Sequence, residues 1–229
     1  MMDNATLAEC KELAGTRENL YGFLAGVFGH SPSQVLLDRV RNGSLLAELV
    51  PLGECEGLDL LQEFAARDGV SSELVRALEV EYAGLFVLPS AGKAQPFESI
   101  YLDPEQRLGG PVSMAVERAY ARAGAQPSPE RLHISDHLSV ELEFMAFLCG
   151  REREAWEADA PTVVWGCLSL EREFLTEHLS RWVGRFATDV KERASTEFYP
   201  AMAGIADEFI RLDLENVRAM LDELPQIGE

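Results

Sequence analysis

Residues 136–148 constrain the fold more than any other stretch, because their apolar side chains recur at the spacing of an α-helix. Such a helix is stable only when its apolar face packs against other elements. Asp136 or Ser135 is the expected N-cap, since a short side-chain oxygen accepts an N–H of the first turn. The chain is therefore expected to be organised around this amphipathic helix. Its apolar positions are Leu138, Val140, Leu142, Phe144, Met145, Phe147 and Leu148.

The same helical period recurs along most of the chain, and no alternation of apolar and polar residues lasts beyond a few positions. The sequence therefore predicts an all-α protein. Glu177 and His178, near the end of one helix, are expected on a solvated face. The other predicted helices span about residues 18–28, 33–40, 44–49, 58–66, 71–88, 112–123, 162–179 and 199–224.

Residues 90–104 interrupt the helical pattern with an extended, non-periodic stretch. Its two prolines and its apolar residues predict an ordered loop rather than a flexible linker. Loops of this length within a compact domain often carry function. The alternative is that Phe97, Ile100 and Tyr101 only anchor the loop to the core.

The charge balance excludes some classes of partner. The 229 residues include 39 acids and 20 bases, which gives a formal net charge of −19. Nucleic acids and anionic membrane surfaces require Lys and Arg to neutralise phosphate, so we expect neither as a partner. An acidic surface favours cationic partners.

Nothing at the N-terminus resembles a signal peptide, and no stretch approaches the length of a membrane span, so we expect a cytoplasmic protein without membrane insertion. The cysteines contain no Cys-x-x-Cys pair, which predicts reduced thiols rather than disulfides or structural zinc. They are Cys10, Cys55, Cys149 and Cys167.

The sequence offers no catalytic motif and no strong cofactor or metal site. It has no phosphate-binding glycine loop and no Gly-x-Ser-x-Gly, and the adjacent residues 135–137 cannot supply the geometry of a triad. His137 and Glu141 share a helical face but are too few to hold a metal, and Glu-x-x-His occurs only at residues 130–133. The acidic start of the central helix is therefore either a solvated, capped helix end or a recognition site for a basic group.

Three segments in order resemble the TorD/DmsD family of molybdoenzyme maturation chaperones. They are Tyr-Ala-Gly-Leu-Phe at residues 82–86, Pro-Phe-Glu-Ser-Ile-Tyr at 96–101 and Asp-His-Leu-Ser-Val-Glu-Leu-Glu-Phe-Met at 136–145. Where this family often has proline before Asp-His, the chain has Ser135.

The resemblance implies one all-helical domain over residues 1–229, with an N-terminal half (about 1–124), a hinge (about 125–137) and a C-terminal half (about 138–229). It also implies a cytoplasmic chaperone, not an enzyme, that needs no cofactor. The chaperone would bind the twin-arginine leader of a molybdenum oxidoreductase precursor until cofactor insertion and export. Monomers and domain-swapped dimers are both compatible with a hinge.

Site residues follow from the resemblance together with the chemistry of arginine. Guanidinium groups are best met by carboxylates, and an apolar leader segment by a hydrophobic groove. We expect three carboxylates, Asp136, Glu141 and Glu98, to face the arginines. Four aromatic residues are expected to line the apolar side: Tyr82, Phe86, Phe97 and Tyr101. Ser99 and, at the hinge, His137 complete the expected site.

Three alternatives remain from the sequence. The client is a leaderless cytoplasmic subunit, as for assembly factors of the nitrate-reductase type. The protein is a nucleotide-binding switch, against which the missing phosphate loop and the negative charge both argue. The third alternative is a helical adaptor that binds a folded partner and ignores leader peptides.

Overall fold

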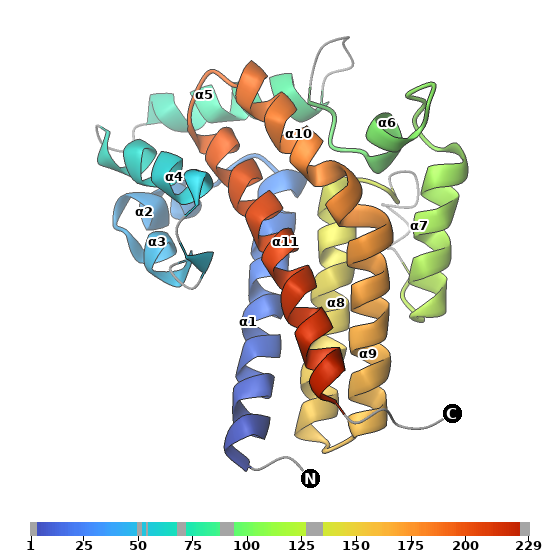
Figure 1. Cartoon of the computed structure of the whole chain (residues 1–229). Coiled ribbons are helices and arrows are strands. Elements are labelled where there is room, and N and C mark those ends of the chain that lie inside the picture. Colours follow the sequence, from blue (N-terminus) through green and yellow to red (C-terminus); the bar gives the residue numbers. More distant parts are fainter. Residues whose placement is uncertain are drawn as a thin grey trace.

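The computed structural model describes residues 4–49, 52–53, 55–67, 72–87, 94–126 and 135–224. Four long helices, α1, α8, α9 and α11, run side by side and form the body of the molecule (Figure 1). The short helices α2, α3 and α4 lie together beside the upper part of α1, and α6 and α7 lie near the upper end of the bundle on the other side (Figure 1). Both described ends of the chain lie at its lower end.

The described residues form helices and contain no β-strand beyond one isolated bridge, which confirms the all-α prediction. Two π-helical turns are present among the described residues: η2 extends α5, and η4 joins α9 to α10. The elements are α1 (Asn4–Gly29), α2 (Gln34–Arg41), α3 (Ser44–Leu49), α4 (Glu56–Ala66), α5 (Ser72–Tyr82), η2 (Ala83–Val87), α6 (Glu98–Leu102), α7 (Gly110–Arg122), α8 (Leu138–Glu157), α9 (Pro161–Phe174), η4 (Leu175–Leu179), α10 (Ser180–Arg193) and α11 (Phe198–Glu223).

The central helix α8 is buried along most of its length, as its apolar pattern predicts. It packs most extensively on α1 and also on α9, while α11 covers α4, α9 and α10. The helices α4 and α11 approach closely at Gly57, where an added Cβ would lie 2.6 Å from the backbone nitrogen of Ile205. Only glycine therefore fits this crossing without a backbone shift.

One helix start differs from the sequence prediction, and one short helix was not predicted. The first helix begins at Asn4 rather than near residue 18. The apolar pattern misses its first half because the buried face there includes the charged Arg17. The stretch predicted as a loop contains the short helix α6, whose Ser99 N–H donates to the carboxylate of Asp136, a residue remote in sequence. A cap supplied from another segment leaves no local signal.

Several predicted features lie outside the described residues. They include most of the predicted hinge, at residues 127–134, with the Glu-x-x-His pattern at 130–133, and part of the predicted loop, at residues 90–93. The division of the chain into two halves about this hinge stays a prediction. Among the helices that the structure describes, none combines the length and the apolar content that a membrane span needs.

Candidate functional site

The two segments around α6 and the start of α8, 37 residues apart in the chain, lie side by side. Phe97 and His137 form an antiparallel bridge. The N–H of Leu138 donates to the carbonyl oxygen of Pro96 at 2.8 Å, and the N–H of Glu98 donates to that of Asp136 at 3.0 Å. The fold thus brings together two of the three sequence motifs, and we call this place the α6–α8 junction.

Asp136 and His137 each cap a helix, but not as the sequence predicts. The carboxylate of Asp136 accepts the N–H of Ser99 at 3.0 Å and so caps α6 rather than its own helix. The ring Nδ1 of His137 accepts the N–H of Ser139 at 3.1 Å and caps α8. The expected N-cap, Asp136 or Ser135, is therefore wrong. Since Nδ1 accepts a hydrogen bond, the neutral ring carries its hydrogen on Nε2.

The three carboxyl groups predicted to face arginines do gather at the junction, but in the interior. Glu141 is fully buried and Glu98 is 1 % exposed, and Asp136 is also buried. The carboxyl group of Glu98 faces that of Glu141 in this cluster. Burial raises the pKa of Glu141 well above the usual range of a glutamate, and the charges of Glu98 and Asp136 raise it further.

Two residues that the sequence reading missed complete this buried cluster. His178 is only 7 % exposed, and its Nδ1 lies 2.9 Å from Oε2 of Glu98. The Nε1–H of Trp182 donates to Oε2 of Glu141 at 3.2 Å. The solvated face predicted for His178 is therefore wrong. A signal existed, because His178 stands four residues after the buried Phe174 and shares its helical face.

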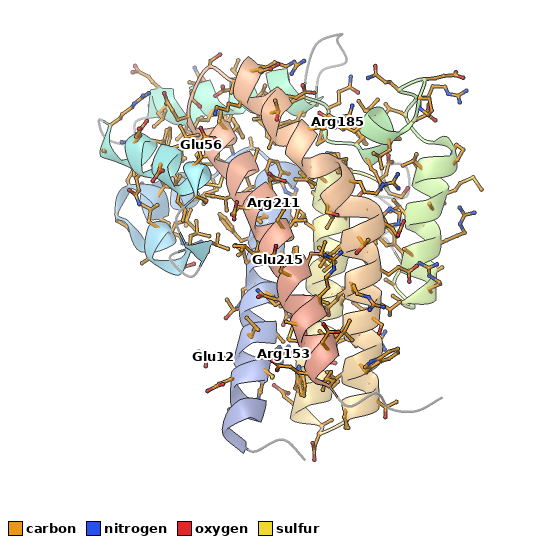
Figure 2. All side chains as sticks on the ribbon, in the orientation of Figure 1. Glu12, Glu56, Arg153, Arg185, Arg211 and Glu215 are labelled. Atoms are coloured by element: carbon orange, nitrogen blue, oxygen red, sulfur yellow. The ribbon has the colours of Figure 1, made fainter. Side chains whose placement is uncertain are left out.

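Tyr101 connects α6 to α10. Its ring stacks on Trp182 with 5.4 Å between centroids, and its hydroxyl donates to Asp189 at 3.0 Å. Arg185 lies on α10 in the upper part of the molecule (Figure 2), and its Nη1 donates to the carbonyl oxygen of Tyr101 at 2.6 Å. Burial raises the pKa of Tyr101, so its hydroxyl stays protonated and able to donate. These contacts hold α6 against the bundle.

Tyr82 and Phe86, the aromatic residues of the first motif, pack inside the protein. The Tyr82 hydroxyl donates to the carbonyl oxygen of Phe28 at 3.0 Å. The Phe86 ring contacts those of Phe186 and Tyr199, with centroids 5.9 and 5.3 Å away. Their contribution in this conformation is to the core, and their predicted role in lining a leader groove stays a prediction.

A surface groove of about 260 Å³ lies beside the junction, between the end of α7 and the first turns of α8. Its most exposed aromatic residue is Phe147, which is 40 % exposed, and Glu143 stands exposed at its edge. The groove therefore combines an apolar floor with an acid. It is lined by Tyr120, Gly124, Ala125, Gln126, Val140, Glu143, Phe144 and Phe147.

A second buried acidic cluster lies lower in the bundle, where α1, α8, α9 and α11 meet. The guanidinium of Arg17 bonds to three carboxylates: Nη1 to Glu152 at 2.5 Å, Nη2 to Asp213 at 3.1 Å, and Nη2 to Glu171. The Tyr21 hydroxyl donates to Asp213 at 2.6 Å. Burial raises the pKa of Glu171 to about 8, although Arg17 acts to lower it.

Among the described residues, this lower cluster also contains the group that most resembles a set of metal ligands. The ligand atoms of Cys149, Glu152 and Glu171 lie within 4.8 Å of one another. However, the guanidinium of Arg17 already bonds to both carboxylates. The cation of this site is an arginine, and the arrangement is a cross-link between four helices.

Comparisons with known proteins agree on one family. Residues 50–188 match the sequence model of a family described as nitrate reductase delta subunit. The chain is 24% identical to a chaperone protein TorD of Shewanella pealeana over 96% of this chain and 97% of that protein. It is 25% identical to a chaperone protein TorD of Vibrio cholerae, over 96% of this chain and 98% of that protein.

One solved structure, of a protein from Archaeoglobus fulgidus described as a redox enzyme maturation protein, is also similar. It is 24% identical, with 85% of this chain and 93% of that chain covered and a TM-score of 0.47.

Proposed function

This chain belongs to the nitrate reductase delta subunit family, which includes the TorD maturation chaperones, and from that premise we propose that it binds the twin-arginine leader of a molybdenum oxidoreductase precursor in the cytoplasm. It would hold the precursor until cofactor insertion and assembly are complete. The relatives are named chaperones, and the family is one of maturation chaperones rather than of enzymes.

The observation that carries this proposal is the grouping of acid and apolar surface around the α6–α8 junction. A leader presents two guanidinium groups followed by an apolar stretch. The groove offers Phe147 and Phe144 for the apolar stretch and Glu143 at its edge for a basic group. Tyr120, which lines the groove, also faces the buried carboxyl groups of Asp136, Glu98 and Glu141.

The test is calorimetric binding of synthetic twin-arginine leaders from molybdoenzymes of the same genome. A control peptide has both arginines replaced by lysine, which keeps the charge but loses the planar bidentate group. We expect one leader to bind at micromolar affinity or tighter and the lysine control to bind less well. Equal binding of the two would show that only the apolar stretch is recognised.

A matched pair of variants tests the groove. Phe147→Ala removes an exposed aromatic side chain from it and should weaken leader binding by about tenfold, as for a partly buried aromatic contact. Trp165→Ala removes a side chain that is similarly exposed, at 42 %, but lies on α9 outside the groove, and should leave affinity unchanged. Equal effects of the two would exclude the groove as the leader site.

A second candidate function is favoured by the description of the matching family. A nitrate reductase delta subunit suggests assembly of a leaderless cytoplasmic catalytic subunit. Binding to such an apo-subunit, together with no response to any leader peptide, would support this function over the first.

A further inference from the structure

The carboxyl groups of Glu98 and Glu141 form a buried pair whose hydrogen bonding is incomplete without a proton. Trp182 donates to Oε2 of Glu141. Oε1 of Glu141 has no donor among the described residues, and the group that faces Glu141 from α6 is a second carboxyl, that of Glu98. Two carboxylates offer only acceptors, so a hydrogen bond between them requires one of the two to be protonated.

The groups around this pair come from four elements, and none of them is a guanidinium. Asp136 faces Glu141 from the turn before α8, Tyr120 faces it from α7, and His178 contacts Glu98 from η4. Trp182 contributes from α10. Burial raises the pKa of Tyr120, so its hydroxyl stays neutral. The cluster thus concentrates carboxyl groups with a histidine as its nearest base.

The Arg17 cluster shows what a guanidinium does for such a set of acids. There, three buried carboxyl groups converge on one arginine, which donates an N–H to each of them, although Oε1 of Glu171 has no partner among the described residues. At the junction, the described residues place no guanidinium at the pair; His178 is the basic side chain beside it, and a proton on the pair serves in place of the guanidinium. A guanidinium is chemically able to replace that proton.

We propose that Glu98 and Glu141 form a guanidinium-for-proton exchange site, which takes one arginine of the partner peptide and releases the proton held between the two carboxyl groups. This rests on the proposed leader-binding function. The only bond that breaks is the O–H of the protonated carboxyl, and its proton passes to solvent as two carboxylates then bind the cation. His178 and Trp182 are positioning residues that hold the two carboxyl groups.

Access to the site requires α6 to separate from α8. Between α6 and α8, the contacts that have to part are the two backbone hydrogen bonds of the bridge between Phe97 and His137 and the bond from Ser99 to Asp136, while Tyr101 keeps α6 on α10. These are few and local, whereas α8 itself is held along its whole length by α1. The opening therefore involves a short helix and leaves the bundle intact.

Exchange makes peptide affinity depend on pH in a defined direction. While the pair holds its proton, binding has to release it, so affinity rises with pH by about tenfold per pH unit for one proton. Above the pKa of the free pair the dependence ends. A simple ion pair with carboxylates that are already charged would show no such release near neutral pH.

The experiment is calorimetry of the twin-arginine leader in two buffers of different ionisation enthalpy at the same neutral pH. We expect about one proton released per peptide bound by the wild-type protein. Glu141→Gln cannot give up a proton and should bind more weakly, with release reduced to near zero. Glu154→Gln, on the exposed far part of α8, is the matched control and should release the same proton as wild type.

A second measurement examines the proton without any peptide. Infrared difference spectra of the free wild-type protein against Glu141→Gln should contain the carbonyl stretch of a protonated carboxylic acid, and its absence would overturn the inference. Leader binding without proton release would also overturn it while leaving the proposed function in place. Failure of every leader to bind would overturn both.

Discussion

The protein buries two clusters of carboxyl groups and compensates them in different ways. In the lower cluster, the three acids bond to Arg17, which comes from α1. At the α6–α8 junction, the carboxyl groups of Glu98 and Glu141 face each other, with His178 and Trp182 beside them. Burying a charge is costly unless it is paired or neutralised by a proton. The lower cluster thus has a resident guanidinium, whereas the described residues supply none at the upper one.

The lower cluster also shows how strongly burial acts in this protein. Glu171 bonds to Arg17, yet burial still raises its pKa to about 8. Desolvation therefore outweighs the attraction of one guanidinium that is shared among three acids. At the junction, where the described residues supply no guanidinium, the same effect raises the pKa of Glu141.

The largest effect is expected from removing the resident cation. Arg17→Met leaves three buried carboxyl groups without a counter-charge and should lower the free energy of unfolding by about 3–5 kcal/mol. Urea denaturation measures this. Arg153→Met, which breaks partly exposed pairs with Glu18 and Glu157, is the control and should cost less than about 1 kcal/mol. Similar losses in both variants would show that the cluster is no cross-link.

A smaller effect is expected at the junction, where Asp136 caps α6. Asp136→Ala removes the acceptor for the N–H of Ser99 and should cost about 1–2 kcal/mol, as for loss of a helix cap. The protein stays folded, and leader binding should weaken. Asp136→Asn keeps a side-chain oxygen and should recover most of the stability. If the alanine variant bound the leader with unchanged affinity, Asp136 would be no part of the site.

The raised pKa of Glu171 predicts a pH dependence of stability. Its pKa is about 8 in the folded protein against an ordinary value of 4.5, so the protonated form favours folding. This contribution is complete below about pH 4.5 and is lost as the pH rises through about 8. Glu171→Gln stays neutral and should gain on wild type by about 1 kcal/mol or more toward the alkaline end. Parallel curves of urea midpoint against pH would contradict this.

Salt should affect leader binding but not the stabilisation by Arg17, and this is the smallest of the four predicted effects. Leader arginines approach through solvent, so raising ionic strength from about 0.1 M to about 0.5 M should weaken binding a few-fold. The loss of stability in Arg17→Met should hardly change over the same range, because buried pairs are little screened. Calorimetry and urea denaturation at the two salt concentrations provide both values.

Local periodicity was enough to predict the helices. The stripes of α8 and α11 are apolar, and both helices lie where the pattern predicts them. The prediction was wrong where the decisive contact is remote in sequence. The short helix α6 is capped by Asp136, and the first half of α1 was missed because it contains a buried Arg17, whose partners come from three other helices.

The candidate site was predicted in part. Resemblance and the chemistry of guanidinium pointed to Glu98, Asp136 and Glu141, and the fold does bring these three together. It also buries them, which no local pattern indicates, because acids at a helix start are ordinarily solvated. His178 and Trp182 were missed as site residues because their partners, Glu98 and Glu141, come from other segments of the chain.

The sequence by itself therefore determined the all-α class, the central amphipathic helix and the acidic character of the chain, since these depend on spacing and composition. Only the tertiary structure decided which carboxyl groups are paired with a guanidinium and which with each other. That distinction depends on contacts between residues far apart in the chain, and the cost of burying a charge makes those contacts decisive for its protonation.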